Sequence, residues 1–252
     1  MRALPQPAVF ISLLHLDPAL VSRPVDDGPV ACIDYIPTPR LAVDGDFEAY
    51  WAARGKNLRQ NVRKQHNRME KDGVPVRHTR LDTPQGVRDG VQSYSELESA
   101  GWKAELGSAV TPGGAQHRFY RQALEELARA GSDAMVYTLH YGDALVAVDL
   151  CIKSFGTCVI LKTTYDERIT KTSPALLLRH AYFKELFEAQ DVHTVEFYGR
   201  VMDWHTKWTD DIRTMYHLNV YRSGAFAKIH SALRSLSGSA RAAAATEKAT
   251  DE

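Results

Sequence analysis

The sequence predicts a mixed α/β (α+β) fold in which helices flank a central sheet. Apolar runs of strand length alternate with longer segments whose apolar residues follow helical spacing, and no repeat of solenoid or propeller length is present. With 252 residues, of which 44% are hydrophobic, the chain is long enough to bury a substantial core. A single layered domain is the simplest arrangement that fits this pattern.

The first 45 residues contain several prolines and two short apolar runs, 9–14 and 30–36, which indicate one or two strands in a loop-rich entry. From 46 to 72, apolar residues recur at near-helical intervals, and Gly73 follows in a position typical of a helix end. This segment is therefore expected to form one long amphipathic helix.

A short strand is expected at 74–78, followed by two helices. The first, 83–100, begins with Thr83 as its cap and a proline in its first turn, and the second, 116–130, is closed by a glycine.

The second half of the chain begins with three adjacent antiparallel strands, because three apolar runs are separated by short turns that contain glycine. A helix, two further strands and a short amphipathic helix complete the pattern. The expected ranges are 134–140, 144–153 and 157–165 for the three strands, 174–190 for the helix, 194–198 and 215–221 for the last strands, and 226–236 for the final helix.

Charge is concentrated in one segment. The chain has 31 basic and 31 acidic residues, but residues 54–71 contain seven basic residues and one acid. An electrostatic partner would be met there, either tRNA or a nucleotide-linked substrate. The alternative is that this segment is a solvated helix face, because its basic residues surround much of the helix circumference.

Three cysteines without a C-x-x-C pair, Cys32, Cys151 and Cys158, fit a reducing cytoplasm better than a secreted disulfide framework. The apolar run at 9–14 is too short for a signal sequence or a membrane span. No metal-binding cluster is present, and neither the nucleophile-elbow nor the P-loop motif occurs. We therefore expect a cytoplasmic protein without a metal.

The start of the helix at 174 is a candidate anion site. Arg168, Lys171, Thr172 and Ser173 crowd the loop before Pro174, and the first helical turn offers free backbone N–H groups and the positive end of the helix dipole. The alternative is ordinary capping of the helix by Ser173.

The run from Trp51 to Arg222 resembles the acetyltransferase domain of the FemAB and CelD type, a branch of the GNAT acyltransferases. The matching pieces are KNLRQNVRK at 56–64, Gly101-Trp102, Tyr165-Asp166, SPALL at 173–177, and Phe197-Tyr198-Gly199 followed by Trp208. The resemblance implies a GNAT-like fold that places the acyl donor between two splayed parallel strands, 157–165 and 194–198. Residues 1–45 would be the remnant of a first half-domain, 46–236 the acyltransferase domain, and 237–252 a mobile tail.

The resemblance also implies acyl-CoA, in particular acetyl-CoA, as co-substrate. GNAT enzymes commonly carry R/Q-x-x-G-x-G/A at the pyrophosphate helix, and Arg168-x-x-Lys171-x-Ser173 has that spacing with both glycines replaced. Where this branch often has Ser-Pro-Gly, the chain has Ser173-Pro174-Ala175. The candidate donor-binding residues are Arg168, Lys171, Thr172, Ser173 and Ala175.

Acyl transfer to an amine needs a base, donors for the developing oxyanion and a proton source for the departing thiolate. Asp149 and Glu196 are candidate bases acting through water, although Asp149 could instead pair with Lys153. Tyr198 is the candidate proton source, and Asp203 is a further polar candidate near the strand split.

His205 stands where relatives often have a lysine, which suggests a group that titrates near neutrality and accepts a proton. Lys207 could supply the cation instead. Alternatively, Trp204 and Trp208 pack on the sheet while His205 points to solvent.

The sequence therefore predicts transfer of an acyl group from acyl-CoA to an amine of an unidentified small molecule or of a cell-envelope or polysaccharide precursor. A FemAB-like aminoacyltransferase that uses charged tRNA at the basic helix is the first alternative, and a non-catalytic GNAT-fold binding module is the second. The acceptor pocket is expected to involve the loop 107–115 and could be completed in a homodimer.

Overall fold

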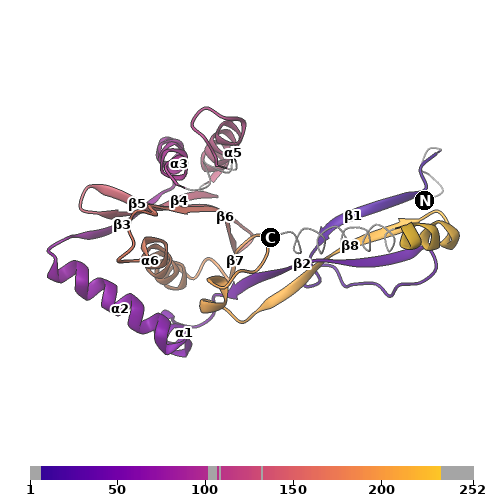
Figure 1. Ribbon diagram of the computed structural model, residues 1–252, viewed down its shortest axis with the longest axis horizontal. Coiled ribbons are helices and arrows are strands. Elements are labelled where there is room, and N and C mark those ends of the chain that lie inside the picture. Colours follow the sequence, from indigo (N-terminus) through magenta and orange to yellow (C-terminus); the bar gives the residue numbers. More distant parts are fainter. Residues whose placement is uncertain (1–6, 102–106, 108, 132, 234–252) are drawn as a thin grey trace, which may run out of the picture. The chain divides into compact units, whose positions relative to one another are not determined.

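The computed structural model describes residues 7–101, 107, 109–131 and 133–233 (Figure 1). The chain divides into two compact units, Pro39–Asp211 and Met1–Thr38 with Ile212–Glu252. The tail predicted at 237–252 lies outside the described residues.

The larger unit contains a mixed sheet in the order β2-β7-β6-β5-β4-β3. Neighbouring strands pair antiparallel except for β6 and β7, which are parallel. The strands are β2 (Val30–Ala42, whose last residues lie in this unit), β3 (Val76–Leu81), β4 (Ala134–Tyr141), β5 (Ala144–Ser154), β6 (Thr157–Tyr165) and β7 (Thr194–Glu196).

Helices cover both faces of this sheet (Figure 1). On one face α3 and α5 pack against β4, and on the other face α6 packs against β3 to β6, with α1 and α2 lying on the outer side of α6. The helices are α1 (Phe47–Ala53), α2 (Lys56–Lys71), α3 (Pro84–Ser99), α5 (Ala115–Gly131), α6 (Pro174–Ala189) and the short 3₁₀ turn η1 (His205–Lys207). The predicted mixed α/β fold with flanking helices is confirmed.

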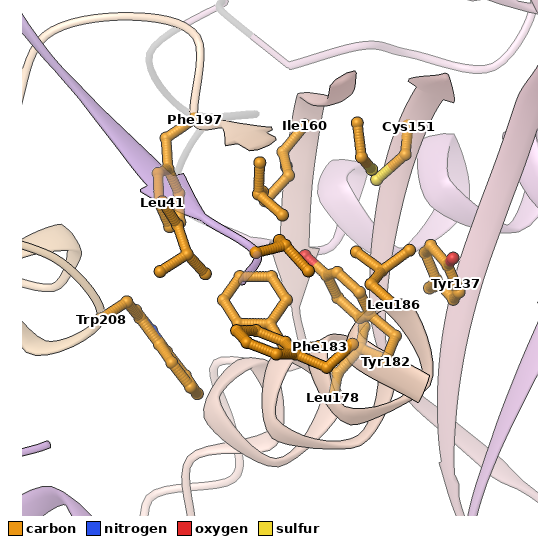
Figure 2. Close-up of a cluster of buried hydrophobic side chains, with 14 of the residues drawn as sticks. Leu41, Tyr137, Cys151, Ile160, Leu178, Tyr182, Phe183, Leu186, Phe197 and Trp208 are labelled. Atoms are coloured by element: carbon orange, nitrogen blue, oxygen red, sulfur yellow. The ribbon is translucent and has the colours of Figure 1, made fainter. Parts of the chain in front are cut away.

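A large apolar core lies between α6 and the sheet (Figure 2). Phe183 and Tyr182 of α6 face Tyr137 and Ile160 of the sheet, and Trp208 packs edge-on against Phe183 with ring centroids 5.0 Å apart. A second core lies under α3 and α5, where Tyr94 and Leu124 are fully or almost fully buried. The sheet is therefore covered by an apolar core on each face.

The smaller unit is an antiparallel sheet in the order β1-β8-β2, formed by β1 (Phe10–Leu16), β8 (Ile212–Tyr221) and the first part of β2. Residues 224–233 are helical and belong to this unit. The strand and the helix that the sequence analysis grouped with the acyltransferase domain are therefore part of a different compact unit.

The long helix expected at 46–72 is wrong, because the chain forms two helices separated at Arg54 and Gly55. Arg54 has an extended conformation with ψ 158°, and its guanidinium donates to the Trp208 carbonyl at 3.1 Å. Glycine is also a poor helix former. A tertiary contact and an unfavourable residue thus interrupt a pattern that is otherwise helical.

The parallel strand expected at 194–198 is shorter than predicted. It ends at Glu196, and the backbone leaves the strand conformation at Tyr198, which has a positive φ of 45°. The strand expected at 74–78 is found at Val76–Leu81. Capping by Thr83 is confirmed, since its hydroxyl accepts from the Gly86 N–H at 3.1 Å.

Candidate functional site

The central feature of the site is the divergence of two parallel strands. β6 and β7 pair at only three positions, Thr157 with Thr194, Cys158 with Val195, and Val159 with Glu196. β6 continues to Tyr165, whereas β7 ends. Among the described strands, none pairs with this edge of β6 beyond Val159, and the Thr163 carbonyl in this part of β6 accepts from the Tyr94 hydroxyl at 3.4 Å.

α6 begins after the loop that follows β6, and its first turn is partly occupied. The Ser173 N–H donates to the Gln65 carboxamide oxygen at 2.6 Å, and the Leu176 and Leu177 N–H groups donate to the Ser173 carbonyl. Ala175 has no such acceptor among the described residues. One backbone donor of this turn is therefore free.

Ser173 is exposed and makes no side-chain cap hydrogen bond, so the capping alternative is wrong. Lys171 is also exposed, and no carboxylate in the described part of the chain pairs with it. The Thr172 hydroxyl accepts from the Tyr141 hydroxyl at 3.1 Å. These residues lie together in the loop before α6.

Arg168 is held by a carboxylate in the same loop. Its Nε and Nη2 donate to the Asp166 carboxylate at 2.8 and 2.7 Å, and this bond lowers the pKa of Asp166. The Arg168 side chain is nevertheless 79% exposed, so the pair can open at little cost.

A buried ion pair lies between the splayed part of β6 and α6. Asp149 of β5 is fully buried, and its carboxylate lies 3.2 Å from Nε of Arg179 and accepts from the Tyr182 hydroxyl at 3.0 Å. Arg179 also donates to the Thr163 hydroxyl of β6. The alternative pairing of Asp149 with Lys153 is wrong, because Lys153 pairs with Asp191 at 2.6 Å.

Arg179 is not among the site residues expected from the sequence. The available signal was a charged residue between apolar neighbours on α6, since Leu178 and Tyr182 on the same helix are fully buried. A charge that a helix places in its buried face requires a buried partner.

His205 belongs to the same network but does not titrate as expected. The Arg179 guanidinium lies 4.0 Å from the ring centroid of Trp204, and Trp204 lies 3.6 Å from the ring of His205. Burial, assisted by the positive charge of Arg179, lowers the pKa of His205 to about 4.

The expectation that His205 titrates near neutrality or points to solvent is therefore wrong, because it is only 4% exposed. Its Nδ1 accepts from the Met202 N–H at 2.8 Å, which leaves the neutral ring with its proton on Nε2.

The two candidate bases lie on opposite faces of the sheet. Asp149 contacts α6, whereas Glu196 alternates with Val195 of the α6-side core and so faces α3 and α5. Tyr198, just after β7, is 68% exposed. The pKa of Tyr120 in α5 is raised, first by burial and then by its electrostatic interaction with Tyr198. Asp203 and Lys207 are exposed in the loop that follows.

The α3 and α5 side of the divergence also contains buried polar groups. Glu98 accepts from the Tyr94 hydroxyl at 2.6 Å and from the Val110 N–H at 2.7 Å, and it is 2% exposed. Lys162 of β6 lies 5.7 Å from the ring of Tyr120. Of the nearby expected acceptor loop 107–115, residue 108 lies outside the described residues, as does Trp102.

No helix in the described ranges combines the length and the apolar character that crossing a membrane requires. In the same part of the chain, no group of three or more His, Cys, Asp or Glu side chains is placed to hold a metal ion.

Solved structures with similar folds share little sequence with this chain. A conserved protein of unknown function from Bacteroides thetaiotaomicron is 13% identical with a TM-score of 0.55, over 81% of this chain and 65% of that chain. The C-terminal domain of a putative lysylphosphatidylglycerol synthetase from Agrobacterium fabrum is 11% identical with a TM-score of 0.54, over 87% and 69%. FemX is 10% identical with a TM-score of 0.55, over 78% and 64%.

The chain thus spans about two thirds of the length of these structures, and at such identities they show a common fold only. No protein of curated function matches the sequence significantly. The family model of the acetyltransferase (GNAT) domain matches residues 56–206, which is more than half of the chain. This match, together with the diverging parallel strands, shows that the chain belongs to the GNAT acyltransferase family.

Proposed function

We propose that this protein transfers an acyl group, in particular acetyl, from acyl-CoA to a primary amine of a small molecule or of a cell-envelope or polysaccharide precursor. The observation that carries the proposal is the unpaired edge of β6 beyond Val159, next to a helix whose first turn keeps a free backbone donor at Ala175. An extended thioester arm can bond to such an edge as an additional strand does.

In the proposed reaction, the amine nitrogen attacks the thioester carbonyl carbon, the C–N bond forms and the C–S bond breaks. The amine loses one proton and the departing thiolate gains one. Backbone N–H groups of the free β6 edge are suited to stabilise the developing oxyanion, because they are fixed by the sheet before the reaction begins.

We assign proton acceptance from the amine to Glu196, acting through water, because it lies at the last paired position before the strands separate. Tyr198 follows it on an exposed turn, and we assign it protonation of the thiolate. Both lie on or next to the sheet face that bears α3 and α5, so the acceptor amine would approach from that side.

Asp149, Arg179 and His205 receive a positioning role in this proposal. Their side chains are buried and make their contacts within the protein, so they are poorly placed to exchange protons with a substrate. They instead fix the loop that follows β7 against α6, which keeps β7 apart from β6. Asp203 is exposed and is assigned no step.

The residues at the start of α6 fit the diphosphate of the acyl donor. Lys171 provides a free cation, and Ser173 and the Ala175 N–H provide two hydrogen-bond donors, whereas Arg168 would have to leave Asp166. The Ser173 N–H already donates to Gln65, so this helix start offers fewer backbone donors to a diphosphate than a fully open one.

Thermal unfolding of the full chain with acetyl-CoA tests the proposal. At a concentration 100 times Kd, acetyl-CoA should stabilise the chain by about 2.7 kcal/mol, which corresponds to a rise in Tm of about 5–11 °C. Lys171→Ala should reduce this shift, and the matched control Lys228→Ala, an exposed lysine in the smaller unit, should leave it unchanged.

An unchanged Tm at saturating acetyl-CoA would refute acyl-CoA as the donor. Stabilisation by charged tRNA in place of acetyl-CoA would favour the aminoacyl-transfer alternative. Release of free thiol from acetyl-CoA only when a panel of amines is added would identify the acceptor class.

A further inference from the structure

A groove of about 470 Å³ opens between α1 and the first half of α2. These two helices form the outer helical layer of the larger unit (Figure 1). Trp51 and Glu48 of α1 line one side, and Lys56, Arg59 and Arg63 of α2 line the other. Its volume falls within the range of small-molecule sites, which is roughly 300–1,000 Å³.

The three cations of the groove have no carboxylate partner within ion-pair distance among the described residues. Arg59 is oriented by a hydrogen bond from its Nε to the Arg54 carbonyl at 3.0 Å, whereas no such bond fixes Lys56 or Arg63. The one acid of the lining, Glu48, has Lys184 as its nearest cation, at 3.9 Å. The groove therefore has an uncompensated positive charge.

The positive charge of Lys56 lies where it interacts unfavourably with the helix dipole. Lys56 is the first residue of α2, a helix with no acidic residue in its first turn and no side-chain cap. Positive side chains at a helix start are repelled by the helix dipole. An anion bound in the groove would offset that repulsion. Anion binding therefore explains why basic residues occur at this helix start, which solvation alone does not explain.

Trp51 adds a flat apolar wall. Its ring is held by His180 in an edge contact at 4.5 Å and by Phe47 at 6.0 Å, while it remains partly exposed and lines the groove. From Lys56 to Arg63 the helix rises by about 10 Å, at 1.5 Å per residue. Cations spread over this length beside an aromatic wall match a ligand with phosphates at one end and a ring at the other.

We propose that the α1–α2 groove binds a nucleoside diphosphate group, with the phosphates among Lys56, Arg59 and Arg63 and the base against Trp51. A free nucleoside diphosphate and a nucleoside-diphosphate-linked molecule share this chemistry, whereas the diphosphate of coenzyme A is assigned to the start of α6. The inference does not rest on the proposed acyl transfer, because the groove is formed by other residues than the α6 start.

Isothermal titration of the full chain with ADP, UDP, coenzyme A and inorganic pyrophosphate tests the groove. Arg59→Gln/Arg63→Gln should weaken binding of ADP or UDP at least tenfold, because each arginine gives a charge-assisted hydrogen bond. The matched control Lys64→Gln/Lys71→Gln removes the same charge from exposed positions of the same helix outside the groove lining, and it should change the affinity less than twofold.

The contribution of the ring is tested separately. Trp51→Leu should weaken ADP binding while leaving the affinity for pyrophosphate within twofold of the original. Because Trp51 also packs on Phe47, Trp51→Phe provides a second variant that keeps an aromatic ring, and circular dichroism confirms that each variant is folded.

The arms of the titration distinguish a nucleotide site from a coenzyme A site. A groove-dependent loss of affinity for ADP or UDP supports the proposal. A groove-dependent loss for coenzyme A alone, with none for ADP or UDP, would overturn it and would also move the donor diphosphate away from the start of α6. Equal losses in the groove and control variants would overturn it as nonspecific attraction. Binding of tRNA without measurable binding of ADP or UDP would overturn it in favour of an RNA surface.

Discussion

Replacing Arg179 with methionine should lower the free energy of unfolding by about 3–5 kcal/mol, the cost of leaving a buried charge without its partner. The Asp149 side chain is 0% exposed and that of Arg179 is 6% exposed. After the substitution, the carboxylate keeps the Tyr182 hydroxyl, 3.0 Å away, as its only hydrogen-bond partner within the part of the chain that the structure describes. The contact of the guanidinium with the Trp204 ring, at 4.0 Å, is lost as well.

The assay is urea unfolding followed by tryptophan fluorescence, together with Tm by calorimetry. At about 2–4 °C per kcal/mol for a chain of this size, Tm should fall by about 6–20 °C. The exposed pair Arg68 and Asp72, 3.6 Å apart at positions i and i+4, provides the control, and Arg68→Met should cost less than about 1 kcal/mol.

A double-mutant cycle separates burial of the charge from loss of packing. The double variant Arg179→Met/Asp149→Leu removes both charges of the pair, so no unpaired charge stays buried. Its loss of unfolding free energy should therefore be smaller than the sum of the two single losses, by about 1 kcal/mol or more. A cost of Arg179→Met similar to that of Arg68→Met would refute the reasoning, since it would mean that water solvates the Asp149 carboxylate.

Three further changes test other parts of the structure. Gly90→Ala should destabilise the chain by about 1–3 kcal/mol in urea unfolding, because the added Cβ would lie 2.7 Å from a Val136 methyl of β4; an unchanged midpoint would contradict the close packing of α3. Lowering the pH from 7 to 4 should cost up to about 3 kcal/mol through His205: its pKa is 6.5 when unfolded and about 4 when folded, so the unfolded state binds the proton first and stability falls as pH falls through this range. His205→Gln should reduce that dependence, and the part that remains is expected from His180, whose pKa burial also lowers to about 4; an equally steep profile would show that His205 is solvated. Tyr198→Phe should lower kcat for thiol release about 100-fold with KM unchanged, and a normal kcat would remove Tyr198 from the reaction.

Local sequence patterns predicted most elements of the larger unit. The hairpin turns between β4, β5 and β6 carry Gly142 and Gly156 with φ of 59° and 73°, a conformation that glycine adopts without strain. Thr83 and the following proline set the start of α3. Such signals work because each depends on a residue and its immediate neighbours.

The break between α1 and α2 could not be predicted in the same way. The apolar spacing of residues 46–72 is helical on both sides of Arg54, and the side chain of Arg54 bonds to a carbonyl 154 residues later in the chain. Glycine alone lowers helix stability only modestly, so the tertiary bond decides the interruption.

The candidate site shows the same division. The polar residues around Ser173 and the two parallel strands were recognisable as segments. The pKa of His205, in contrast, depends on burial and on Arg179, which lies 26 positions away in the sequence. The separation of Asp149 from Glu196 onto opposite faces likewise depends on the register of two strands.

The sequence by itself determined the order and type of most elements, the cluster of positive charge at residues 54–71 and the polar loop before α6, because these are properties of contiguous residues. Only the tertiary structure decided that Asp149 is committed to Arg179, that Gln65 takes an amide of the α6 start and that three cations border a groove beside Trp51. Burial and ion pairing depend on which distant segments meet, and that is set by packing of the whole unit.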